Sequence, residues 1–79
     1  MKARVVVTLK TGVLDPQGKA IEGALGSLGI AGIAEVRQGK VFDIEMTGAD
    51  AQDARASLTA ACEKLLANTV IENYAIEIA

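Results

Sequence analysis

The chain has no histidine, no tryptophan, and only one cysteine and one proline among its 79 residues. Without histidine it lacks the commonest general base and the commonest metal ligand, so a histidine-activated nucleophile and a histidine-based metal site are excluded. Cys62 has no second cysteine with which to form an internal disulfide, which suits a reducing compartment. No apolar run approaches the ~18 residues that cross a membrane, and no basic start precedes an apolar segment. These absences predict a soluble cytoplasmic protein.

Positive charge and aromatic side chains are also scarce. The formal net charge is −2 and only 3% of the residues are aromatic. Nucleic acids are usually bound by a basic surface with stacking aromatics, so we expect no partner of that kind. A chain of this size hides only about 60–65% of its unfolded surface. We therefore expect one domain, residues 1–79, with an aliphatic core that gains stability by association.

Hydrophobic periodicity predicts the order strand, helix, strand, strand, helix, strand. The predicted elements are a strand at 2–10, a helix that ends at Gly29, strands at 33–37 and 41–47, a helix capped by Asp50, and a strand at 70–78. Asn68 is expected to end the second helix in a left-handed conformation. The apolar stripes that should face the core are Ile21, Ala24, Leu25 and Leu28 in the first helix, and Ala54, Leu58, Ala61, Cys62, Leu65 and Leu66 in the second.

This order predicts an α+β, ferredoxin-like two-layer sandwich, in which a four-stranded antiparallel sheet carries both helices on one face. The first strand then lies between the third and the fourth. Charges on the other face agree with that placement, because basic side chains on the first strand meet acidic ones on both neighbours. These residues are Arg4 and Lys10, with Asp43, Glu45 and Glu77 opposite them.

The two middle strands are predicted to form a hairpin around Gln38-Gly39-Lys40. A two-residue loop would expose Phe42, whereas a three-residue loop pairs Val36 with Phe42 and keeps the apolar side chains on one face. The same register pairs Ala34 with Ile44. We therefore expect Gly39 or Lys40 to adopt an unusual backbone conformation.

The stretch from Asp15 to Gly18 marks the start of the first helix. Asp15 is a good N-cap and Pro16 suits the first helical position. No phosphate-binding pattern is present, because neither G-x-x-x-x-G-K-[ST] nor G-x-G-x-x-G occurs, and the capping carboxylate discourages an anion. Gln17 and Gly18 are poor choices for helix propensity alone, so this corner serves another purpose as well.

The remaining candidate sites have simpler explanations. Cys62 lies on an apolar stripe and is interpreted as a core residue. Asp43 and Glu45 fit a solvated sheet face, and Arg37 with Lys40 fits a solvated turn. We find no catalytic constellation, no metal site and no cofactor site.

Three stretches carry a more specific pattern: VTLKTGVLDPQGKAIEGALGSLG, VRQGK and CEKLLANTVIENYAIEI. Together they resemble the PurS family, the small subunit of phosphoribosylformylglycinamidine (FGAM) synthase, over nearly the whole chain. Thr69 is a departure, since the family commonly has proline after the asparagine.

The resemblance implies a non-catalytic subunit in purine biosynthesis that associates with itself, as a dimer or tetramer. It also implies two larger partners: a PurQ-like glutaminase that releases ammonia, and a PurL-like synthetase that uses ATP and Mg²⁺ on formylglycinamide ribonucleotide. The small subunit would hold the two together so that ammonia passes between them, and would bind no cofactor itself.

We expect the partner contacts at two places. One is the corner formed by Asp15, Pro16, Gln17 and Gly18, and the other comprises Arg37, Gly39 and Lys40.

The residues alone leave two other functions open. A small-molecule-sensing dimeric module rests on fold analogy, and a ligand that raised the melting temperature of the chain would favour it. A stand-alone enzyme is disfavoured by the missing histidine, metal site and phosphate loop, and turnover by the chain alone would establish it.

Overall fold

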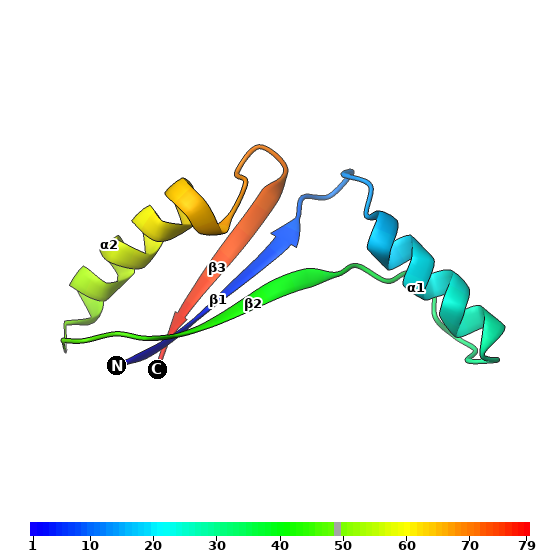
Figure 1. Ribbon diagram of the computed structural model, residues 1–79, viewed down its shortest axis with the longest axis horizontal. Coiled ribbons are helices and arrows are strands. Elements are labelled where there is room, and N and C mark those ends of the chain that lie inside the picture. Colours follow the sequence, from blue (N-terminus) through cyan, green and yellow to red (C-terminus); the bar gives the residue numbers. More distant parts are fainter. Residues whose placement is uncertain (49) are drawn as a thin grey trace.

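The computed structural model describes residues 1–48 and 50–79. In this part of the chain it contains three strands and two α-helices (Figure 1): β1 (Lys2–Leu9), α1 (Pro16–Ser27), β2 (Gly39–Glu45), α2 (Ala51–Ala61) and β3 (Glu72–Ile78). A turn of π-helix, η1 (Cys62–Leu66), continues α2. The α+β class is therefore confirmed.

Both helix starts form as predicted. The carboxylate of Asp15 caps α1, with Pro16 in its first turn, and the carboxylate of Asp50 accepts the amide of Gln52 at 2.8 Å at the start of α2. Gly29 follows α1 with a φ of +78°, a conformation that only glycine adopts readily. The sequence therefore marked both capped helix starts and the end of the first helix.

The sheet is antiparallel with the order β2-β1-β3, so β1 lies in the middle as predicted. The register places Arg4 opposite both Asp43 and Glu77, and its Nε donates to Oδ1 of Asp43 at 2.8 Å. The predicted charge complementarity is confirmed for Arg4, whereas Lys10 lies beyond the end of β1 and Glu45 is paired with Lys2 instead.

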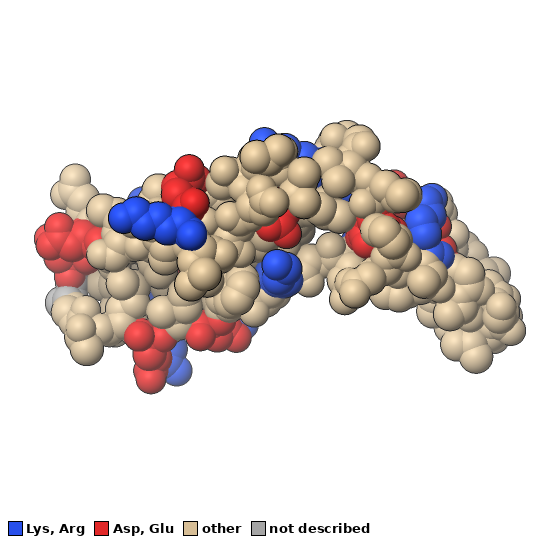
Figure 2. Space-filling view, turned by 45° about the horizontal axis from the view of Figure 1, so that its top comes forward, with Lys and Arg blue, Asp and Glu red and all other residues tan. Residues whose placement is uncertain are grey.

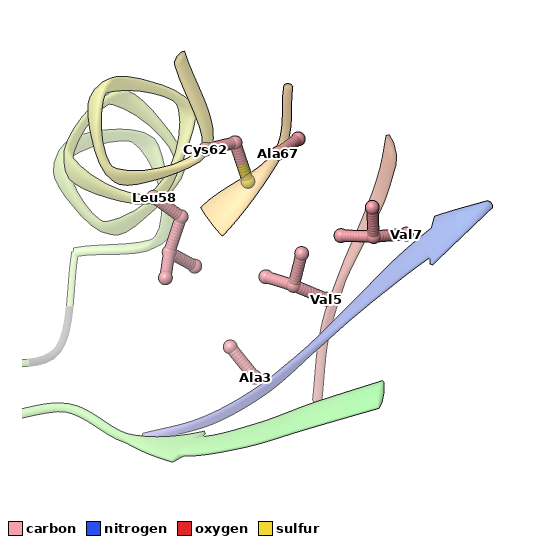
Figure 3. Close-up of a cluster of buried hydrophobic side chains, with 6 residues drawn as sticks. All are labelled: Ala3, Val5, Val7, Leu58, Cys62 and Ala67. Carbon is pink, nitrogen blue, oxygen red and sulfur yellow. The ribbon is translucent and has the colours of Figure 1, made fainter. Parts of the chain in front are cut away.

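The core lies between one face of the sheet and α2 (Figure 3). Val5 and Val7 of β1 are fully buried, and Leu58 and Cys62 point at them from the helix. The predicted side of β3 packs here too, through Tyr74, Ile76 and Ile78. We call this the inner face of the sheet.

Two expectations about the end of the second helix are wrong. The amide of Ala67 donates to the carbonyl of Cys62 at 3.0 Å, five residues back, and this wide π-turn leaves Leu65 81% exposed while Ala67 is buried. No described residue other than glycine has a positive φ, so Asn68 is not left-handed. Its carbonyl instead accepts the amides of Ile71 and Glu72 in a turn.

Residues 16–38, which we call the arm, do not cover the sheet (Figure 1). Residues 33–37 form no strand, so the described chain has three strands where four were predicted, and α2 alone packs on the inner face. The predicted hairpin at 38–40 is absent because Gly39 and Lys40 already belong to β2, paired with Thr8 and Val7.

Gly39 also lacks the unusual backbone conformation that the hairpin required. Glycine is needed there for a different reason, because a Cβ at this position would lie 2.6 Å from the carbonyl oxygen of Val7. Since Lys40 is an ordinary strand residue as well, β2 runs straight on into the arm.

The extended arm makes the molecule long, with extents of 48 × 25 × 15 Å and a radius of gyration of 15.9 Å. A compact domain of this length has a radius of gyration of about 12 Å. The accessible surface is 5560 Å², about 1,000 Å² more than the ~4,500 Å² typical of a monomer of 8.2 kDa. The predicted apolar stripe of α1 is correspondingly uncovered, with Leu28 74% exposed.

Candidate functional site

The carboxylate of Asp15 joins the start of α1 to the returning segment of the arm. Its Oδ1 accepts the amide of Gly18 at 2.9 Å, and its Oδ2 accepts the amide of Gln38 at 2.7 Å. Asp15 is only 5% exposed, and both of its oxygens are used. One buried side chain therefore caps the helix and binds a backbone amide 23 residues further along the chain.

Glu22, two turns into the same region of α1, has a similar role. Its Oε1 accepts the amide of Val36 at 2.7 Å, while its other oxygen lies 3.4 Å from Nζ of Lys19. The backbone amides of Val36 and Gln38 are thus both bound by carboxylates from α1 or its N-cap. We call Asp15, Gly18, Glu22, Val36 and Gln38 the Asp15 junction.

Gly18 permits the close approach on which this junction depends. It is buried, and a Cβ built at this position would overlap the carbonyl oxygen of Val36. The poor helix former noted in the sequence therefore serves backbone packing.

The two predicted contact segments lie together around this junction. Arg37 donates from Nη1 to the carbonyl of Val13 at 2.8 Å and from Nη2 to that of Lys10 at 3.2 Å. Nζ of Lys40 lies 3.8 Å from Oε2 of Glu72 on β3. Of the seven predicted residues, Asp15 and Gly18 are buried, whereas the exposed ones are Pro16, Gln17, Arg37, Gly39 and Lys40.

Sequence reasoning missed three members of the junction, of which Val36 was assigned to a strand of the sheet. Glu22 reads as an ordinary exposed helix residue, and Gln38 as the first residue of a hairpin loop. Only the fold of the arm shows that the carboxylate of one, and the backbone amide of the other, are bound across the chain.

A small cavity of about 160 Å³ lies beside the junction, lined by Val7, Leu9, Asp15, Gln17, Gln38, Gly39, Lys40 and Glu72. Small-molecule sites usually enclose about 300–1,000 Å³, so this cavity is smaller than a typical ligand site. Among the described residues no cluster of His, Cys, Asp or Glu could hold a metal ion, and none of their helices has the length and apolar content to cross a membrane.

The amides at the junction favour the charged form of both carboxylates. The backbone amide of Gln38, followed by that of Gly18, lowers the pKa of Asp15, and burial opposes this only in part. The amide of Val36 likewise lowers the pKa of Glu22, with help from Lys19. Both side chains are thus held as carboxylates at neutral pH.

Two other groups with a shifted pKa, Cys62 and Tyr74, belong to the core and its border. Burial raises the pKa of the Cys62 thiol, and neighbouring Glu63 adds to this, so the thiol is a poor nucleophile. The hydroxyl of Tyr74 donates to Glu63 at 2.8 Å, and this hydrogen bond is the main cause of its raised pKa. Neither group lies in a site suited to catalysis.

Known proteins resemble this chain over nearly its whole length. The family described as PurS: Phosphoribosylformylglycinamidine (FGAM) synthase matches residues 2–79. The phosphoribosylformylglycinamidine synthase subunit PurS of Mycobacterium leprae is 51% identical over 75 residues, which cover 95% of this chain and 91% of that protein. The chain belongs to the PurS family.

Solved PurS structures share the elongated form described above. The C2 crystal form of Bacillus subtilis PurS superposes with a TM-score of 0.86 at 45% identity, covering 96% of this chain and 94% of that one. A chain in the structure of PurLQS from Thermotoga maritima superposes with a TM-score of 0.88 at 30% identity, covering 96% and 93%. The extended arm therefore belongs to a shape that PurS proteins have in common.

Replacing Gly18 with alanine should destabilise this PurS chain by about 1–3 kcal/mol, because the new methyl group overlaps the Val36 carbonyl. Gly23→Ala is the matched control, since a Cβ there meets nothing within 4 Å and alanine should stabilise the helix by about 0.5–1 kcal/mol. Denaturant unfolding at one protein concentration measures both changes. Equal effects of the two substitutions would contradict the close packing at Gly18.

The junction should also weaken in acid. Because folding lowers the pKa of Asp15 and Glu22, their contribution is complete above the ordinary carboxylate pKa of about 4 and is lost as the pH falls through the folded values. The melting temperature of Asp15→Asn should therefore lie furthest below that of the unmodified chain at pH 7, and the gap should narrow toward pH 3. A gap that stayed constant over this range would show that ionised Asp15 contributes nothing.

Proposed function

We propose that this chain is the small subunit of an FGAM synthase and that it joins a glutaminase subunit, PurQ, to a synthetase subunit, PurL. The observation that carries the proposal is the full-length likeness to a chain of the Thermotoga maritima PurLQS structure, whose name places PurS together with PurL and PurQ. The family match over residues 2–79 supports the same assignment.

The chain's own contribution is assembly. Asp15, the buried charged residue of the described chain, has both carboxylate oxygens bound by backbone amides, which suits a structural role. ATP and Mg²⁺ are used by the synthetase partner, and this chain binds neither. Its role is to hold the glutaminase and the synthetase so that ammonia passes between them.

The surface of the junction is the proposed docking site for a larger subunit. Pro16, Gln17, Arg37 and Lys40 are exposed, and Gln17 and Lys40 line one hollow beside Asp15. The side chains of Arg37 and Lys40 are held by bonds to the Val13 carbonyl and to Glu72. The buried bonds of Asp15 make this group rigid before the partner arrives, and binding to a preformed surface costs less conformational entropy.

We also propose that the chain associates with itself. The ferredoxin-like sandwich with four strands is then completed in the assembly, because a single chain leaves the fourth strand position beside β2 empty and α1 uncovered. The uncovered surface of about 1,000 Å² is of the size that one partner contributes to a stable interface.

Reconstitution tests the assembly role. The glutaminase and synthetase subunits are mixed with and without this chain, and FGAM formation is measured with glutamine or with free ammonia as the nitrogen source. Leaving the chain out should reduce glutamine-dependent turnover far more than ammonia-dependent turnover. Equal reductions would refute the role in ammonia transfer, and turnover by this chain alone would refute a non-catalytic subunit.

Gln17→Arg tests the docking surface. The added bulk and charge should weaken assembly and glutamine-dependent turnover, whereas the milder Gln17→Ala should have a smaller effect. Gln52→Arg is the matched control, because Gln52 is also exposed and occupies the equivalent position, second in its helix, at the start of α2. Unchanged assembly with Gln17→Arg, measured by size-exclusion chromatography of the mixed subunits, would place the docking surface elsewhere.

A further inference from the structure

The arm joins the sheet at its base. Figure 2 shows the tip of the arm without blue or red side chains, and no residue from 23 to 34 carries a charge. The charged side chains of the arm belong to the two segments nearer the sheet: Lys19, Glu22, Glu35 and Arg37. Two stretches of chain connect this base to the sheet (Figure 1): residues 10–15, which follow β1 and which we call the linker, and the start of β2.

The linker contains a tight turn that is anchored to the sheet. The amide of Lys10 donates to the carbonyl of Ile71 at 2.8 Å, and the amide of Val13 donates back to the carbonyl of Lys10 at 3.1 Å. Gly12 has a φ of +89°, a left-handed conformation that is typical of glycine at the third residue of a four-residue turn. Because the turn follows the end of β1 directly, its position is set by the sheet.

Arg37 ties the returning segment of the arm to both ends of this turn. Its Nη1 donates to the carbonyl of Val13 at 2.8 Å and its Nη2 donates to the carbonyl of Lys10 at 3.2 Å. The two nitrogens belong to one planar group with fixed spacing, so the guanidinium matches two carbonyls at once. We call these two bonds the Arg37 pin.

The neighbours of Arg37 are held as well. Glu22 binds the amide of Val36, and Asp15 binds the amide of Gln38. Three consecutive residues are therefore bound, the outer two through their amides and the middle one through its side chain. The bond from Glu22 lies within the arm, whereas the Arg37 pin crosses from the arm to the linker.

The Arg37 pin lies next to the docking surface along both segments. Gln17 follows Val13 in the first segment and Lys40 follows Arg37 in the second, and both line the hollow beside Asp15. A bond that fixes Arg37 against Val13 therefore also limits how far Gln17 and Lys40 can move apart. Although Arg37 is exposed, the bonds of its guanidinium are made inside the chain.

We propose that Arg37, which the sequence suggested as a partner contact, is instead a positioning residue for the docking surface. Its guanidinium pins the arm to the linker turn and so holds Gln17 and Lys40 in the arrangement that a larger subunit binds. This inference rests on the docking surface proposed above and assigns the role of one of its residues.

The Arg37 pin requires arginine. Lysine would keep the positive charge, but its single nitrogen on a flexible stem cannot match two carbonyls in a fixed geometry. Methionine keeps an unbranched apolar stem and donates nothing. Since both acceptors are neutral carbonyls of the same chain, the pin should respond little to salt, whereas an exposed ion pair with a partner would be screened.

Hydrogen exchange of the full chain, followed by NMR, tests the pin. In Arg37→Met the amide of Val13 should exchange about tenfold faster, because loss of hydrogen bonds from a charged donor favours local opening of the turn. The amide of Val5 in the middle of β1 should keep its rate. Arg55→Met is the matched control, since Arg55 is also exposed and donates to a backbone carbonyl, that of Ile76 at 3.4 Å. An unchanged rate at Val13 would overturn the pin.

Titration of this chain into the glutaminase and synthetase subunits, followed by glutamine-dependent turnover at low and high salt, tests the positioning role. Arg37→Met and Arg37→Lys should both raise the half-saturating concentration about tenfold, because the arrangement that binds is less populated. The factor should be the same at both salt concentrations, and Arg55→Met should leave the half-saturating concentration unchanged.

Three outcomes would overturn the positioning role. Full assembly with Arg37→Lys, or an effect that shrinks at high salt, would show that Arg37 is a direct ionic contact. Unchanged assembly with Arg37→Met, despite faster exchange at Val13, would show that the pin serves the fold of this chain alone. The result is separable from the proposed function, because exchange needs no partner subunit and the comparison of glutamine with ammonia uses the unmodified chain.

Discussion

The structure depends on two oxygen atoms of one buried carboxylate. One oxygen of Asp15 begins α1 and the other holds the amide of Gln38, so the direction of the helix and the path of the returning chain are set together. Gly18 lets the backbones approach closely enough for both bonds. This double contact ties the returning segment of the arm to the start of α1, and the bond between Glu22 and the amide of Val36 adds a second tie.

Local physical chemistry predicted the elements that are stabilised within themselves. The alternation along β1, the two aspartate caps and the glycine after α1 depend only on residues close in sequence. The structure confirms all of them. The charges of Arg4 and Asp43 also indicated the correct neighbour in the sheet. In the site, the segments near Asp15 and Lys40 were selected from the sequence, and the structure brings them together.

The predictions were wrong where the sequence pattern does not identify the segment that a residue will contact. The apolar stripe of α1 predicts that one face of the helix will be covered. It does not show whether the same chain or another one covers that face. Gly39 next to lysine is typical of a turn, yet the requirement for glycine comes from the carbonyl of Val7 on another strand. Leu65 was misplaced by a single wide turn that periodicity of 3.6 residues cannot anticipate.

The same features bear on how the length of this chain can vary. Residues 28–34 at the tip are all exposed, so extra residues there would lengthen the arm without disturbing the pairing of the strands. Carboxylates bind the amides of Val36 and Gln38, and β1 pairs with the residues from Gly39 onward. One residue inserted here would turn the side chains that follow to the opposite face. Natural insertions and deletions should therefore be common at the tip and rare within residues 36–42.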